Sequence, residues 1–133
     1  MAIQLDHIGI LVRNIDEALP HYTDILGFSV LHDERVQATG VRVLFLDAGS
    51  VMIQLVEPFG QGQINDDFQR YGEGLHHLCY AVNDIEGAVR RLAPGADVRI
   101  FPGSRDQRAA FLPRDDKGIL VELTEVSPGE EER

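Results

Sequence analysis

Leu5-Asp6-His7-Ile8-Gly9-Ile10-Leu11-Val12 and Leu75-His76-His77-Leu78-Cys79-Tyr80-Ala81-Val82 are two copies of one motif, seventy positions apart. Each copy continues in a similar way, as Asn14-Ile15-Asp16-Glu17-Ala18 and as Asp84-Ile85-Glu86-Gly87-Ala88. A repeat of this length predicts two similar structural units. His7 and His77 stand at the same place in both copies, inside apolar strands, which indicates a site built between the units.

The first copy opens a predicted βαβββ module over residues 4–57. Residues 4–12 alternate weakly and are rich in Ile, Leu and Val, as a strand is. Asn14 can then cap a helix that ends at Gly27, with Glu17 completing a capping box and Pro20 near the first turns. Strands are predicted at 28–36, 41–48 and 51–57.

The second copy predicts the same order over residues 75–126, after a polar connection at 58–74 with a short helix around 65–68. We expect a strand at 75–82, a helix at 84–93, and strands at about 97–101, 108–113 and 119–125. An acidic tail follows at 127–133. The sequence therefore predicts a single α+β domain over 1–133, made of two tandem βαβββ modules.

Composition excludes several classes of function. The chain has 133 residues and a net charge of −10, which argues against nonspecific binding to nucleic acid. No apolar run is long enough for a membrane span, and the first residues lack a signal-peptide pattern. Cys79 is the only cysteine, which excludes an internal disulfide and fits a reducing cytoplasm, the expected location.

The last strand of each module carries one polar residue among apolar ones. Aligning Ile53-Gln54-Leu55 with Val121-Glu122-Leu123 superposes Gln54 on Glu122. Together with His7 and His77 they give two imidazoles, an amide oxygen and a carboxylate, a mixed set that suits a first-row divalent ion with open positions. Each residue alone is ordinary, but their joint placement in the repeat favours a metal site.

Neighbouring residues allow further predictions. His76 must point to the opposite face from His77, where it supports a neighbouring element or a dimer contact. Cys79 shares the parity of His77, and we interpret it as a small buried hydrophobe. Seven of the twelve basic residues lie between Arg90 and Lys117, either as a solvated face or as a landing site for an anionic ligand.

The chain resembles the vicinal oxygen chelate, or glyoxalase-like, superfamily over residues 4–126. The motif of His7, the segment His21-Tyr22-Thr23-Asp24-Ile25-Leu26-Gly27-Phe28 and the segment Gly118-Ile119-Leu120-Val121-Glu122-Leu123 carry this resemblance. It implies two βαβββ modules whose strands form a cupped mixed sheet around a metal, with homodimers common.

Within that superfamily the chain is most similar to methylmalonyl-CoA epimerases, through Gln54-Leu55-Val56-Glu57-Pro58, Gly72-Glu73-Gly74-Leu75-His76-His77 and Val82-Asn83-Asp84-Ile85. The resemblance implies the ligand set His7, Gln54, His77 and Glu122, reached above from the repeat. This chain departs from the epimerase pattern at Val43, where many epimerases carry a second carboxylate. It also departs in the segments 102–108 and 111–118, which shape the substrate pocket in the family.

These features predict a divalent-metal-dependent epimerase or isomerase that removes a proton next to a carbonyl. Glu122 is both ligand and leading candidate base, and the second base is unidentified. The metal, which is Co, Mn, Ni, Zn or Mg, is not fixed by the sequence. Arg105 and Arg108 are the candidate substrate-binding residues, because an acyl-CoA substrate would need cationic partners for its phosphates.

Three alternatives remain open at this point. A glyoxalase I-type lyase acting on a glutathione hemithioacetal uses the same proton chemistry. An Fe(II) extradiol dioxygenase needs His7, His77 and Glu122 but leaves Gln54 in a position that oxygen would occupy. A metal-free binding protein would sequester a small molecule without using the four ligands.

Overall fold

The computed structural model describes residues 3–128, so most of the predicted acidic tail lies outside the described residues. The chain divides into two compact units. The N-terminal unit comprises residues 7–76, and the C-terminal unit comprises residues 1–6 and 77–133. The prediction of a single domain over 1–133 stays a prediction.

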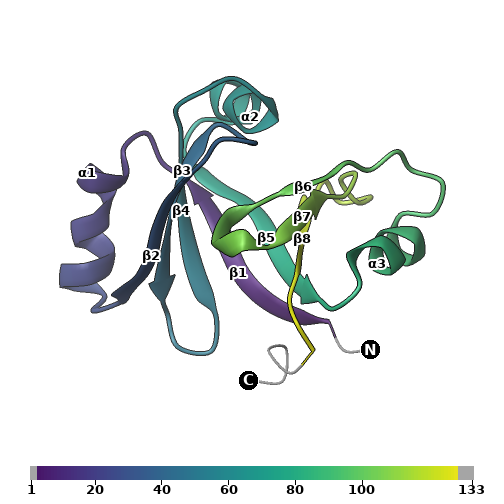
Figure 1. The fold of residues 1–133 in the computed structure, drawn as a ribbon. Coiled ribbons are helices and arrows are strands. Elements are labelled where there is room, and N and C mark those ends of the chain that lie inside the picture. Colours follow the sequence, from purple (N-terminus) through teal and green to yellow (C-terminus); the bar gives the residue numbers. More distant parts are fainter. Residues whose placement is uncertain (1–2, 129–133) are drawn as a thin grey trace. The chain divides into compact units, whose positions relative to one another are not determined.

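The N-terminal unit contains a four-stranded sheet, two α-helices and a π-helical turn (Figure 1). The strand order is β2-β3-β4-β1, with β4 and β1 parallel and the other neighbours antiparallel. The elements are β1 (Gln4–Leu11), whose first residues belong to the C-terminal unit, α1 (Ile15–Pro20), η1 (His21–Ile25), β2 (Ser29–Val36), β3 (Val41–Asp47), β4 (Met52–Pro58) and α2 (Gln63–Tyr71).

The C-terminal unit repeats this plan with strand order β5-β8-β7-β6, in which β5 and β8 are parallel. Its elements are β5 (Gly74–Val82), which begins in the N-terminal unit, α3 (Ile85–Leu92), β6 (Ile100–Pro102), the 3-10 turn η2 (Ser104–Asp106), β7 (Arg108–Phe111) and β8 (Val121–Glu125). The predicted α+β class with two βαβββ modules is confirmed. No helix within residues 3–128 has the length and apolar character needed to cross a membrane.

Both module helices begin with the same pair of side-chain contacts. The Asn14 side chain accepts a hydrogen bond from the Glu17 amide, and Asp84 accepts one from the Gly87 amide. These bonds satisfy amide groups that the first helical turn leaves unpaired. The cap at Asn14 was predicted, whereas the Glu17 carboxylate binds Arg13 at 2.6 Å in place of the predicted capping box. The Ile15 and Ile85 amides are also satisfied, by the carboxylates of Glu57 and Glu125 at 2.8 and 3.1 Å.

Each helix covers one face of its own sheet. Ile15 of α1 packs with Leu44, Leu46 and Leu55 in the N-terminal unit. The equivalent cluster of the C-terminal unit has members from α3 and its strands: Val82, Ile85, Ala88, Ala110, Leu112 and Leu123. Burying each large apolar side chain contributes about 1.5–3 kcal/mol, so the two clusters hold the two helices against the two sheets.

The predicted helical stretch ending at Gly27 is present but is not regular throughout, and one predicted strand is misplaced. The helix after Asn14 is α-helical only to Pro20, where the chain passes into the wider turn η1, closed by a bond from the Leu26 amide to the His21 carbonyl. Proline has no amide hydrogen and its ring crowds the preceding turn, so it ends the regular ladder. The strand expected at 97–101 is a short strand at Ile100–Pro102 instead.

Candidate functional site

The N-terminal unit carries His7 on β1 and Gln54 on β4, and both side chains are buried. The two parallel strands pair with Gly9 opposite Gln54. Because alternate residues of a strand share a face, His7, Gly9 and Gln54 lie on one face, while Leu55 packs on the other face against Ile15 of α1. The face of each sheet that points away from its helix is called the site face below.

The amide oxygen of Gln54 has the properties of a ligand atom. Within residues 3–128, no hydrogen-bond donor reaches Gln54 Oε1, although this atom is buried. A buried acceptor left in this state costs roughly 1–3 kcal/mol. The ring of His7, on the same face, makes an edge-to-face contact with Phe45, with 5.1 Å between the ring centroids.

The C-terminal unit carries His77 on β5 and Glu122 on β8, with Nε2 of His77 3.2 Å from Oε1 of Glu122. Cys79 stands opposite Glu122 in this parallel pair, so His77, Cys79 and Glu122 share the site face. Leu123 points to the other face, where it packs with Ile85 of α3.

The registers of the two units are the same. Gly9 and Cys79 are equivalent positions of the repeat, and they face Gln54 and Glu122 respectively. The predicted alignment of Gln54 with Glu122 is therefore confirmed. Each unit places one imidazole and one side-chain oxygen on its site face, and a ligand role for these four residues stays a prediction.

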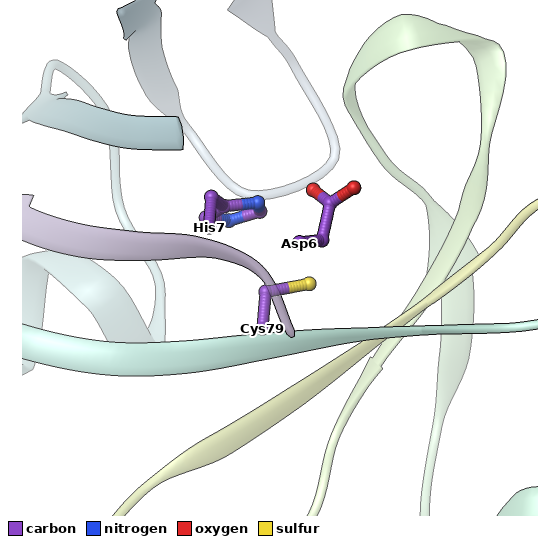
Figure 2. A group of neighbouring side chains, drawn as sticks. All are labelled: Asp6, His7 and Cys79. Atoms are coloured by element: carbon purple, nitrogen blue, oxygen red, sulfur yellow. The ribbon is translucent and has the colours of Figure 1, made fainter. Parts of the chain in front are cut away.

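A buried acidic environment surrounds the thiol of Cys79. Figure 2 shows its Sγ beside the carboxylate of Asp6, the residue that precedes His7 on β1, and the two groups lie within 4.8 Å. Burial, followed by the negative charges of Glu122 and Asp6, raises the pKa of Cys79 well above its ordinary value. The thiol is therefore protonated at neutral pH, in keeping with the prediction that it is a buried hydrophobe rather than a nucleophile.

His76 has a partner on the opposite side of its strand from His77. Its Nε2 lies 2.8 Å from Oδ2 of Asp67 on α2, and both side chains are buried. Gln63 donates a hydrogen bond to the other oxygen of Asp67. The prediction that His76 faces away from His77 and supports a neighbouring element is confirmed by this contact, which holds α2 against the start of β5.

Arg105 and Arg108 lie beside a cavity of about 600 Å³ in the C-terminal unit, with Asn83 and Glu125 also in its wall. Both arginines already bind carboxylates. Arg105 Nη2 lies 2.8 Å from Asp6, and the backbone of Arg105 is left-handed with φ of 59°, which is costly for a residue other than glycine. Their role in substrate binding stays a prediction.

The contacts of Arg108 have a counterpart in the other unit. Arg108 binds Glu86 in the first turn of α3 at 2.8 Å, together with Glu125. Arg42 on β3 binds Asp16 in the first turn of α1 at 3.2 Å. Asp16 and Glu86 are equivalent in the repeat, so each arginine links a strand to the start of its module's helix.

Sequence reasoning missed the carboxylates that fix these contacts. Glu57 and Glu125 each follow the candidate oxygen donor of their strand by three positions, so the repeat contained a signal for both helix contacts. Asp6 lies 99 positions before Arg105, its partner. Asp67 meets the nearby His76, but it lies in the connection between the modules, which the repeat does not cover.

The geometry agrees with a family match. The model of the glyoxalase/bleomycin resistance protein/dioxygenase superfamily matches residues 6–128. The chain belongs to this superfamily. The resemblance inferred from the His7 and Glu122 motifs is thus confirmed, and the two βαβββ modules are consistent with the superfamily's vicinal oxygen chelate fold.

Relatives within the superfamily include epimerases. The chain is 37% identical to the uncharacterized protein YqjC of Bacillus subtilis, over 92% of this chain and 91% of the relative. It is 33% identical to the ethylmalonyl-CoA/methylmalonyl-CoA epimerase of Cereibacter sphaeroides, over 92% and 98%. The crystal structure of methylmalonyl-CoA epimerase from Mycobacterium tuberculosis aligns with a TM-score of 0.82 and 30% identity, covering 98% of this chain and 92% of that one.

Proposed function

We propose that the chain is a divalent-metal-dependent epimerase that inverts the carbon next to the thioester carbonyl of a 2-substituted malonyl-CoA such as methylmalonyl-CoA. The observation that carries the proposal is the shared register of the two modules, each with one imidazole and one side-chain oxygen on its site face. Relatives named as epimerases, at 30–33% identity, support the reaction class.

We propose that the ion is held by His7, Gln54, His77 and Glu122, two from each module. Gln54 Oε1 fits this role, because it is a buried oxygen that no donor within residues 3–128 reaches, and a bound cation would satisfy it. Mixed nitrogen and oxygen donors suit Co, Mn, Ni, Zn or Mg. When bound, such an ion supplies positive charge that stabilises the negative charge developing on a substrate carbonyl oxygen.

Glu122 is the proposed base that removes the proton. It is the one carboxylate of the four residues, and its Oε1 lies 3.2 Å from Nε2 of His77. A carboxylate oxygen of Glu122 takes the proton from the carbon next to the carbonyl as the C–H electron pair moves toward that carbonyl. Returning a proton to the opposite face of the same carbon completes the inversion.

Arg105 and Arg108 are the proposed partners of the anionic part of an acyl-CoA, since they lie beside the cavity of about 600 Å³. A substrate phosphate would compete with Asp6 for Arg105 and with Glu86 for Arg108. Replacing both arginines with glutamine should raise KM and reduce its dependence on salt, with kcat less affected. An unchanged KM would count against the CoA thioester and leave the proton chemistry standing.

The test of the reaction is solvent exchange. Purified protein supplied with divalent metal is incubated with methylmalonyl-CoA in deuterium oxide, and deuterium at the carbon next to the thioester carbonyl is measured by mass spectrometry. We expect catalysed exchange together with inversion. If the protein catalyses exchange neither with methylmalonyl-CoA nor with any other acidic acyl thioester, the proposal is overturned. Turnover of the methylglyoxal–glutathione hemithioacetal instead would identify a glyoxalase-type lyase.

A further inference from the structure

A histidine and a glutamate form a pair on β2 of the N-terminal unit. Nε2 of His32 lies 2.7 Å from Oε1 of Glu34. The two residues are two positions apart on one strand, so their side chains share a face. Their side chains remain 40% and 31% exposed, so a ligand on that face has access to them.

The strand register places this pair on the same face as His7 and Gln54. His32 is paired with Phe45, and Phe45 is paired with Gln54, whose partner on β1 is Gly9. Residues paired across neighbouring strands point to the same side of a sheet, so the row runs across the site face of the N-terminal unit.

Ring contacts follow the same row. The ring of Phe45 meets the ring of His7 at 5.1 Å and the ring of His32 at 6.2 Å between centroids. Phe45 is 0% exposed. The His32–Glu34 pair therefore borders the same packed aromatic residue that holds the candidate metal ligand His7.

Glu34 has a particular relation to Val43. These two residues are cross-strand partners, so their side chains are neighbours on the site face. Val43 is an apolar residue that is 3% exposed. Glu34 thus places an ionisable side chain on β2 next to an apolar residue of β3.

Inversion at carbon needs two proton-handling groups, one for each face of the carbon. We propose that His32, positioned by Glu34, is the second of these groups, a role that rests on the proposed epimerase function. Because Glu34 contacts Nε2 of His32, the proton moves at Nδ1. In one direction the C–H bond breaks and its proton goes to Glu122. The Nδ1–H bond of His32 then breaks, and its proton forms the new C–H bond on the opposite face.

The reverse direction exchanges the two roles. After a turnover in the first direction Glu122 is protonated and His32 is neutral. After a turnover in the reverse direction Glu122 is ionised and His32 is protonated. Proton exchange with water restores the starting state in both cases. Glu34 acts through His32 by accepting its Nε2–H and stabilising the imidazolium, so Glu34 is a positioning residue.

The proposal separates inversion from exchange. In His32→Asn, the epimer whose proton Glu122 removes should still exchange that proton for deuterium with retention, at a rate close to that of the wild type. Inversion of either epimer should fall about 100-fold or more, the usual contribution of a general acid or base. Glu34→Gln should reduce inversion less than His32→Asn does, because the imidazole of His32 remains in the Glu34→Gln variant.

Asp33→Asn is the matched control. Asp33 lies between the two residues on β2 but on its other face, where it binds Arg42 at 2.9 Å. Each epimer of methylmalonyl-CoA is incubated separately in deuterium oxide with each variant, and chirality and deuterium content are followed together. Thermal unfolding and metal content of each variant are measured alongside.

Inversion by His32→Asn at a rate within a few fold of Asp33→Asn would overturn the assignment. Equal loss of exchange and inversion for both epimers, in a folded variant that retains metal, would also overturn it, because that result indicates a role in binding. Wild-type protein that exchanges neither epimer would instead show that the proposed function has failed, and the role of His32 with it.

Discussion

In the N-terminal unit a neutral amide at Gln54 shares the site face with His7, whereas in the C-terminal unit a carboxylate at Glu122 shares it with His77. The registers are the same, and both module helices are fixed by a glutamate from the last strand of their own module. The scaffold is thus repeated while the chemistry differs. An amide oxygen can accept a hydrogen bond or bind a cation, but a carboxylate oxygen can also take a proton.

The substitution Glu122→Gln makes the C-terminal pair of donors chemically the same as the N-terminal pair. We expect proton exchange to fall about 10²–10⁴-fold, because the proposed base is lost while an oxygen donor stays in place. Solvent deuterium exchange measures the effect. The reciprocal variant Gln54→Glu should lose much less activity. Equal losses in the two variants would show that proton removal is not specific to the C-terminal unit.

Breaking the contact between His76 and Asp67 tests the other side of β5. Both side chains are buried, so Asp67→Ala leaves a buried imidazole without its carboxylate. We expect the free energy of unfolding to fall by about 3 kcal/mol, measured by urea denaturation. Metal affinity should stay close to that of the wild type in this variant and in His76→Ala. Metal loss from His76→Ala equal to that from His77→Ala would contradict the assignment of faces.

Arg42 and Arg108 each link a strand to the start of a helix, one in each unit. Replacing them should have the smallest effect on the free energy of unfolding, and this effect can be compared between the units. Hydrogen bonding from Arg42 lowers the pKa of Asp33, and hydrogen bonding from Arg108 lowers the pKa of Glu86. A lowered pKa means that the folded state favours the charged carboxylate. The resulting stability is present at neutral pH and is lost as the pH falls through the lowered pKa.

We therefore expect Arg42→Gln to reduce the free energy of unfolding by about 0.5 kcal/mol at neutral pH, since its carboxylate partners are largely exposed. The difference from the wild type should shrink in acid, and Arg108→Gln should follow the same direction. Urea denaturation of both variants across the acid range measures it. A difference that grows in acid would rule out the ion pairs as its cause.

Repetition made the fold and the donor alignment predictable. Asn14 and Asp84 mark both helix starts, and the spacing of His7 and His77 sets the two modules in register. The matching triplets Ile53-Gln54-Leu55 and Val121-Glu122-Leu123 aligned Gln54 with Glu122. Local sequence carries these features, because caps and strand alternation depend on residues close together in the chain.

Features formed by residues distant in sequence were not predictable. The contact between Asp6 and Arg105 joins residues at opposite ends of the chain, through a backbone conformation at Arg105 that its residue type disfavours. The pair of His32 and Glu34 was also missed, because it has no counterpart among the repeated motifs. Its position on the site face depends on the pairing of β2 with β3, and sequence alone does not fix that register.

The central claim is that the two modules each supply half of one metal site, and metal titration tests it most directly. Isothermal titration of metal-free protein with a divalent ion should give one ion per chain. His7→Ala and His77→Ala should each weaken binding by at least about 100-fold, although the changes lie in different modules. Two ions per chain, or one ion bound with unchanged affinity after either substitution, would contradict the account.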